Sequence, residues 1–190
     1  MSDPTPVPAH LAPAFEIDLE VLERARGIRV AIFDVDGVLT DGSLFLGDNG
    51  EEYKAFHSRD GHGMKMLVRN GVDTAIITGR TSQVVEHRCR DIEIKHLYQG
   101  AVEKLPVFEA LLEKLGVSVE ESVFVGDDVV DLPIMRRVGL SVAVRDAHAL
   151  VREYAHWITP SPGGRGAARE VCELLMYAQG RYAAEMKKYL

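Results

Sequence analysis

An apolar run that stops at two carboxylates and a glycine constrains this chain more than any other segment. The run from Ile28 to Phe33 leads directly into Asp34, Val35, Asp36 and Gly37. A continuous β-rich run is typical of a parallel strand that is covered on both faces. In open α/β sheets, ligands bind just beyond the carboxyl ends of such strands, so we expect Asp34 to lie where chemistry takes place. A strand that merely ends in an Asp-Gly turn is the alternative.

A second acidic cluster argues against that alternative. The apolar residues 123–125 lead into Gly126, Asp127 and Asp128, and Asp131 follows three residues later. Carboxylates gathered at one edge of a sheet repel one another and raise one another's pKa. A divalent cation relieves that repulsion, and hard oxygen ligands favour Mg²⁺, which leaves positions for water and a substrate phosphate. Because no Cys/His spacing indicates structural zinc, the sequence predicts a magnesium site.

The rest of the chain alternates between strand and helix patterns. We expect strands at 72–78, 96–98, 122–126 and 140–144, and helices at 61–70, 81–90, 101–115, 129–138 and 147–154. This order predicts an α/β fold with a doubly wound, mainly parallel sheet and right-handed crossovers. Residues 43–57 hold two extended pieces around a Gly-Asp-Asn-Gly turn, which predicts a small projecting β-hairpin.

Composition narrows the class of protein. With 190 residues, 46% of them hydrophobic, the chain can bury one substantial core. The net charge of -7 argues against a general nucleic-acid binder, which usually presents a basic patch. No stretch is long and apolar enough to cross a bilayer, and no leader pattern opens the chain. Cys89 and Cys172 fall in predicted helices as buried thiols, so we expect a soluble cytoplasmic protein.

The two ends are expected to lie outside a single domain at 28–180. Residues 1–27 are interpreted as a proline-rich lead-in and a short helix around 19–25, and residues 181–190 as a tail. Gly163, Gly164, Arg165 and Gly166 precede an amphipathic helix. They are interpreted either as a plain surface loop or as a flexible approach to an anion. We therefore expect truncation before Gly163 to change turnover and to leave the core folded.

One ordered set of motifs resembles a known superfamily. Asp34-x-Asp36-Gly-Val-Leu-Thr40, Thr78-Gly79-Arg80, Lys104 and Gly126-Asp127-Asp128-x-x-Asp131 are similar to the motifs of the haloacid dehalogenase phosphohydrolases. Taken alone, Thr78-Gly-Arg could cap a helix and Lys104 could be a solvated charge. Their joint order at expected strand ends favours one shared site.

The resemblance implies a two-step phosphoryl transfer. Asp34 would attack phosphorus and form an aspartyl-phosphate that water later hydrolyses. Asp36 would serve as general acid and then as general base. The Asp34 side chain, the Asp36 main-chain carbonyl and the Asp127 side chain would hold Mg²⁺.

The same resemblance gives the other motif residues supporting roles. Thr78, Gly79 and Lys104 would hold phosphate oxygens and offset their charge. Asp128 and Asp131 would orient water ligands or Lys104.

Within that superfamily the chain resembles the 3-deoxy-D-manno-octulosonate 8-phosphate phosphatase family. The matching segments start at Asp34, Glu51, His96 and Gly163, and the resemblance spans about 28–180. It implies a cap-lacking enzyme, usually tetrameric, whose hairpins and C-terminal tails help enclose a neighbouring subunit's site. The family releases phosphate from an eight-carbon acidic sugar phosphate on the route to bacterial lipopolysaccharide.

The expected substrate contacts follow from the same match, because guanidinium groups suit a carboxylate and a phosphate. They are Asp36, His57, Ser58, Arg59, Asp60, Gly61, Gly79, Arg80, Arg88, Lys104 and Arg165. A surface salt bridge is the alternative for Arg88. The chain departs from the family pattern at 101–103, where more polar amides are expected, and at His57, where Asn is also familiar.

Three other functions are compatible with parts of this pattern. A sialic-acid-type 9-phosphate phosphatase shares much of the pattern. A phosphorylation-switched receiver also combines acids, Mg²⁺, Thr and Lys, but it usually places its acidic pair first and its phosphoacceptor later. An inactive binding or assembly module would retain the fold without turnover.

Overall fold

The structure, a computed structural model, describes residues 11–190. The lead-in expected at residues 1–10 lies outside the described residues. Within 11–190, six parallel strands form one sheet in the order β5-β4-β1-β6-β7-β8. The strands are β1 Val30–Phe33, β4 Asp73–Ile77, β5 His96–Tyr98, β6 Ser122–Gly126, β7 Leu140–Ala143 and β8 Trp157–Ile158.

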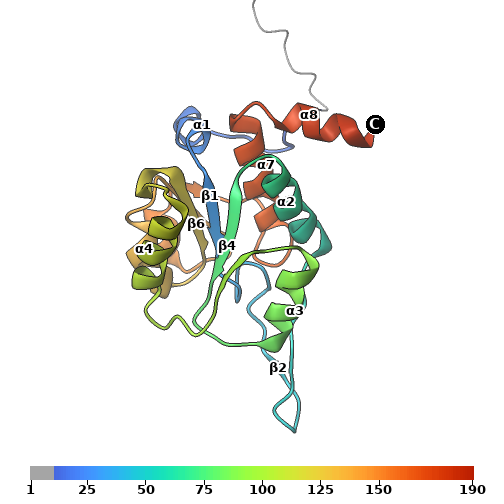
Figure 1. Ribbon diagram of the computed structural model, residues 1–190, viewed down its shortest axis with the longest axis vertical. Helices are drawn as coiled ribbons and strands as arrows, with labels where there is room; N and C mark the ends of the chain where they lie inside the picture. Colours follow the sequence, from blue (N-terminus) through green and yellow to red (C-terminus); the bar gives the residue numbers. More distant parts are fainter. Residues whose placement is uncertain (1–10) are drawn as a thin grey trace, which may run out of the picture.

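Helices cover both faces of this sheet, as a doubly wound fold requires. The helix α4 lies on one face and α2, α3 and α7 lie on the other (Figure 1). The α-helices are α1 Leu19–Arg26, α2 Ser58–Arg69, α3 Gln83–Asp91, α4 Lys104–Leu115, α5 Leu132–Met135, α6 Ala149–Tyr154, α7 Ala167–Ala178 and α8 Tyr182–Met186. Short 3-10 helices are present at η2 Val119–Glu121, η3 Val129–Asp131 and η4 Lys187–Tyr189.

The two strands that end in carboxylates are neighbours at the centre of the sheet. Both β1 and β6 are buried along their whole length, which explains why their sequences are nearly all apolar. In the register of the sheet, Phe33 lies opposite Val125 of β6 and Ile76 of β4. The strands β4 and β5 lie on one side of β1, and the later strands β6, β7 and β8 lie on its other side. In open α/β sheets, ligand sites form beside the carboxyl ends of the strands where the order of connection changes direction in this way.

The predicted parallel sheet and hairpin are confirmed. The hairpin pairs β2 Phe45–Leu46 with β3 Glu52–Tyr53 in antiparallel register. The predicted helix at 129–138 is wrong in its extent, because η3 and the one-turn α5 take its place. The strand β8 was not expected, since two residues are too few to give a periodic pattern.

The glycine-rich segment before α7 is part of the folded core, and the expectation of a flexible approach is wrong. The Gly163 N–H donates to Asp146 Oδ1 at 2.9 Å, and the Gly164 N–H donates to the Val38 carbonyl at 2.8 Å. A Cβ on either glycine would clash with the backbone after β1. The helix α7 then supplies seven buried residues, so a chain cut before Gly163 would lose part of its core.

The last ten residues also pack on the domain. They include α8 and η4, and Tyr182 and Glu185 are buried. Glu185 accepts from Arg69 of α2 at 3.1 Å. The division of the chain at residues 27 and 180 stays a prediction. None of the helices in residues 11–190 is long and apolar enough to cross a membrane.

Candidate active site

Asp34 is held rigidly at the end of the central strand. Its N–H continues the sheet by donating to the Val125 carbonyl at 3.1 Å, and the residue is 6% exposed. The following turn is fixed by the Val35 carbonyl, which accepts from the N–H groups of residues 38, 39 and 40. The buried Thr40 hydroxyl accepts from the Gly37 and Gly42 N–H groups. Hydrogen bonds within this turn therefore fix the position of the Asp34 carboxylate.

Gly37 allows the second acidic cluster to approach this turn. Its φ of +91° lies in the region that favours glycine, and a Cβ at this position would clash with the Asp127 carboxylate. Asp127 follows β6, the neighbour of β1. One carboxylate oxygen each from Asp34, Asp127 and Asp131 lies within 4.8 Å of the others. The two strand ends thus converge as the sequence predicted.

The charges at this edge are unbalanced. Burial and then Asp131 raise the pKa of Asp34 to about 6, although Lys104 opposes the shift. Burial, followed by Asp131, Asp34 and Asp128, raises the pKa of Asp127 to about 8. The buried Oδ1 atoms of Asp34 and Asp127 have no hydrogen-bond partner within residues 11–190. Orphaned oxygens on two carboxylates that converge at one edge of the sheet fit a hard divalent cation.

Both carboxylate oxygens of Asp131 accept hydrogen bonds from other groups of the protein. Its Oδ1 accepts from the Lys104 ammonium at 2.7 Å, and its Oδ2 accepts from the Asp127 N–H at 3.1 Å. Lys104, the first residue of α4, also lies 2.9 Å from Asp34 Oδ2 and is 4% exposed. Asp131 thus contacts Lys104, which agrees with one of the two roles considered for it. Asp128 accepts from the Val129 N–H at 2.7 Å and begins η3.

An open cavity of about 360 Å³ lies over these groups. It is lined by Asp34, Asp36, Thr78, Gly79, Arg80, Ala101, Val102, Lys104, Asp127, Asp128 and Val130. All the expected catalytic and metal-binding residues are in this lining, together with Gly79 and Arg80. The cavity offers carboxylates on one side and Lys104 and Arg80 as cations, which is the charge pattern for a phosphate with a metal ion.

The other expected substrate residues do not line this cavity in the single chain. They are His57, Ser58, Arg59, Asp60, Gly61, Arg88 and Arg165. Asp60 is 2% exposed and accepts from the N–H groups of Gly166 and Arg169, at 3.3 and 2.9 Å. It therefore joins α2 to the start of α7. Its contact with substrate stays a prediction.

Two arginines of this group, Arg88 and Arg165, have partners outside the cavity. Arg88 pairs with Asp91 at 2.7 Å and lies over the Phe56 ring, 5.9 Å from its centroid. The salt bridge considered for Arg88 is present. Arg165 pairs with Asp41 at 3.1 Å, and it lines a second cavity with Arg59.

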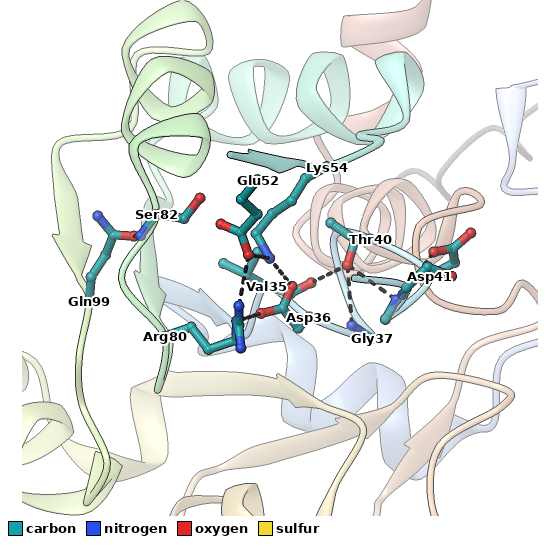
Figure 2. A network of polar contacts seen from close by, with 12 residues as sticks. Val35, Asp36, Gly37, Thr40, Asp41, Glu52, Lys54, Arg80, Ser82 and Gln99 are labelled. Carbon is teal, nitrogen blue, oxygen red and sulfur yellow. Dashed lines mark hydrogen bonds and ion pairs between the residues drawn. The ribbon is translucent and has the colours of Figure 1, made fainter. Parts of the chain in front are cut away.

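Sequence reasoning missed two charged residues of the hairpin. The Lys54 ammonium contacts Asp36 Oδ1 at 2.5 Å and Glu52 Oε1 at 3.3 Å. Arg80 donates to Glu52 at 2.9 Å, and its Nε lies 3.5 Å from Asp36 Oδ2 (Figure 2). The neighbouring Ser82 hydroxyl, and then Arg80 and Lys54, lower the pKa of Glu52 to about 2. The signal was the i, i+2 spacing of Glu52 and Lys54, which places both side chains on one face of a strand.

A carboxylate at the end of a central parallel strand, a lysine beside it and an acid from the adjacent strand define a haloacid dehalogenase-like hydrolase. That family matches residues 92–171. The 3-deoxy-D-manno-octulosonate 8-phosphate phosphatase of Escherichia coli is 51% identical over 165 residues, which are 87% of this chain and 88% of the relative. The chain belongs to the 3-deoxy-D-manno-octulosonate 8-phosphate phosphatase family and is a phosphoric monoester hydrolase.

Solved structures agree with this assignment. The phosphatase of this family from Yersinia pestis has a TM-score of 0.86 and 47% identity, and the match covers 87% of this chain and 90% of that one. The enzyme from Moraxella catarrhalis, in complex with a magnesium ion, a phosphate ion and KDO, has a TM-score of 0.88 and 37% identity, over 90% and 98% of the two chains. Mg²⁺ is accordingly the cofactor of this family.

The raised pKa of Asp127 predicts how stability changes with pH when no metal is added. The folded group binds a proton between its unfolded value, 3.8, and about 8, whereas the unfolded group does not. The contribution of Asp127 to the free energy of unfolding therefore falls as pH rises through that window, by at most about 1.4 kcal/mol per pH unit. Urea unfolding in EDTA at several pH values measures this slope. In the Asp127→Asn variant this contribution is expected to disappear, and an unchanged slope would contradict the assignment.

Proposed function

We propose that this protein hydrolyses 3-deoxy-D-manno-octulosonate 8-phosphate to the free sugar acid and inorganic phosphate in lipopolysaccharide biosynthesis in the cytoplasm. The family assignment supports the substrate. The observation that carries the chemistry is the Asp34 carboxylate in the lining of a cavity shared with Lys104 and Asp127. The other Asp34 oxygen, Oδ2, lies 2.9 Å from the Lys104 ammonium, so the carboxylate is held beside a cation that can also meet a phosphate.

The metal site of this proposal consists of the Asp34 and Asp127 side chains and the Asp36 main-chain carbonyl. Asp131 is excluded because Lys104 and the Asp127 N–H occupy its oxygens. When bound, Mg²⁺ supplies positive charge that stabilises the transferring phosphoryl group. It would also compensate the carboxylates that repel each other at this edge.

In the first proposed step, a carboxylate oxygen of Asp34 attacks phosphorus and the bond from phosphorus to the sugar oxygen breaks. Asp36 gives its proton to the departing alkoxide. In the second step, water attacks the phosphorus of the aspartyl-phosphate and passes a proton to Asp36. The bond between phosphorus and Asp34 then breaks, and both carboxyl groups return to their starting state.

Lys104 and Thr78 hold the phosphoryl oxygens in this proposal. Thr78 is 3% exposed and lies in the cavity lining, as Gly79 does. The Lys104 ammonium is fixed by two carboxylates, so its charge needs no reorganisation when the transition state forms. Arg80, nearly half exposed at the same cavity, is proposed to meet the acidic sugar.

We also propose a homotetramer, following the family resemblance. The hairpin and the segment before it expose apolar side chains at Leu44, Phe45, Leu46 and Tyr53, and exposed apolar groups of this kind are typical of contact surfaces. An assembly of this type would let residues such as Arg59 and Arg165 act near a neighbour's site. Light scattering on the protein as it elutes from a size-exclusion column measures the number of subunits. A monomer would contradict the proposed homotetramer.

A substrate panel tests the proposed function. Phosphate release is measured with eight-carbon and nine-carbon keto-acid phosphates, each with Mg²⁺ and with excess EDTA. We expect the eight-carbon substrate to have the higher kcat/KM and EDTA to remove turnover, because the site then lacks its compensating charge. A preference for nine carbons would favour the sialic-acid-type enzyme. A long-lived phosphorylated protein without phosphate release would indicate a receiver.

A further inference from the structure

We propose that Lys54 is a positioning residue for Asp36 and that Glu52 fixes Lys54 in place. The inference rests on the proposed function, in which Asp36 exchanges protons with the leaving group and with water. It adds the β2–β3 hairpin to the machinery of the reaction within one chain. Figure 2 shows Lys54 and Glu52 beside Asp36, with Arg80 contacting the same two carboxylates.

The first observation is the burial of the Lys54 charge. Its side chain is 1% exposed, and its ammonium contacts Asp36 and Glu52. A buried ammonium is costly unless it is paired. Its two partners therefore hold the Lys54 side chain in one place. A flexible surface lysine would show neither this burial nor two carboxylate partners.

The second observation is where Lys54 lies relative to the cavity. Asp36 lines the cavity, whereas Lys54 and Glu52 do not. Lys54 thus contacts Asp36 without occupying the space for substrate, so it acts through Asp36 and not on the phosphate.

The third observation concerns the two oxygens of Asp36. Lys54 donates to Oδ1, while the nearest cation to Oδ2 is the Arg80 Nε at 3.5 Å, too far for a strong hydrogen bond. The last torsion of an aspartate is soft, so an unanchored carboxylate rotates readily. Anchoring Oδ1 leaves Oδ2 as the oxygen for proton exchange, in a fixed orientation.

Leaving groups of different basicity provide the test. A sugar alkoxide needs a proton to depart, whereas the phenolate of p-nitrophenyl phosphate does not. The value of kcat/KM covers the steps up to departure of the leaving group, so it reports this proton transfer separately from hydrolysis of the aspartyl-phosphate. We compare Lys54→Met with wild type on the eight-carbon sugar phosphate and on p-nitrophenyl phosphate.

The expected result is a selective loss. Lys54→Met should lower kcat/KM for the sugar phosphate by roughly 10²-fold and for p-nitrophenyl phosphate by less than about fivefold. Asp36→Asn should show the same selectivity. Adding Lys54→Met to Asp36→Asn should cause no further loss, because residues that act as a unit are not additive.

Two further variants keep the result interpretable. Lys65→Met removes a lysine that pairs with Glu93 at 2.7 Å outside the cavity. This variant should leave kcat/KM unchanged for both substrates. Lys54→Gln keeps an N–H donor for Asp36 and should recover part of the activity if Lys54→Met does not fold. If Lys54→Met lowered kcat/KM equally for both substrates, or lowered it further by the full factor when added to Asp36→Asn, Lys54 would only stabilise the position of the hairpin. If the wild-type protein did not hydrolyse the sugar phosphate, the proposed function itself would be overturned.

Discussion

Asp34→Asn is expected to lower kcat/KM by about 10⁴-fold or more, because it removes the oxygen that attacks phosphorus. The amide is nearly the same size, so the turn after β1 should still form. Steady-state phosphate release measures the loss. Acid quenching with labelled substrate tests the intermediate directly, because wild type should carry label on the protein and Asp34→Asn should not.

A second aspartate controls for the loss of a carboxylate. Asp73 is exposed at the first position of β4, at the opposite end of the sheet from the site. Asp73→Asn should keep wild-type kinetics. If Asp34→Asn still became labelled and released phosphate at a normal rate, the nucleophile would have to be another residue.

Lys104→Met is expected to reduce both stability and activity. The ammonium lies 2.9 Å from Asp34 and 2.7 Å from Asp131, and its removal leaves two buried carboxylates without their cation. Breaking a buried pair of this kind costs about 3–5 kcal/mol of unfolding free energy. Loss of a fixed charge at the phosphoryl group should lower kcat by roughly 10²-fold or more. Urea unfolding and steady-state kinetics measure the two effects.

A double variant separates the two roles of Lys104. Adding Asp131→Asn to Lys104→Met removes one of the two stranded carboxylates and should recover part of the lost stability. It should not recover kcat, because the charge at the phosphate remains absent. Recovery of both quantities would mean that Lys104 contributes only by neutralising Asp131.

The catalytic edge of the sheet was predictable because its residues follow strands with strong local signals. Asp34 and Asp127 each come after an apolar run, and neighbouring parallel strands bring such ends together. Lys104 and Thr78 were identified by their order in a family pattern. That pattern gives residue types and spacing, and it holds here because each residue lies at a strand or helix end.

Contacts between distant surface segments could not be predicted in the same way. Asp60 binds the start of α7, 106 residues later in the chain, and nothing near Asp60 in the sequence indicates that partner. The partners of Lys54 depend on how a hairpin with strands of two residues folds back over Asp36. Short strands carry little periodicity, so propensity defines such a hairpin but not its contacts.

The contact of Gly163 and Gly164 with the turn after β1 has a consequence for biosynthesis. The turn that carries the proposed nucleophile is made early in translation, whereas the segment that packs against it is near the end of the chain. Domains fold as units while the ribosome extends the chain from its N-terminus. The site should therefore reach its final shape only after α7 has left the ribosomal exit tunnel, and a nascent chain that has not released these residues should be inactive.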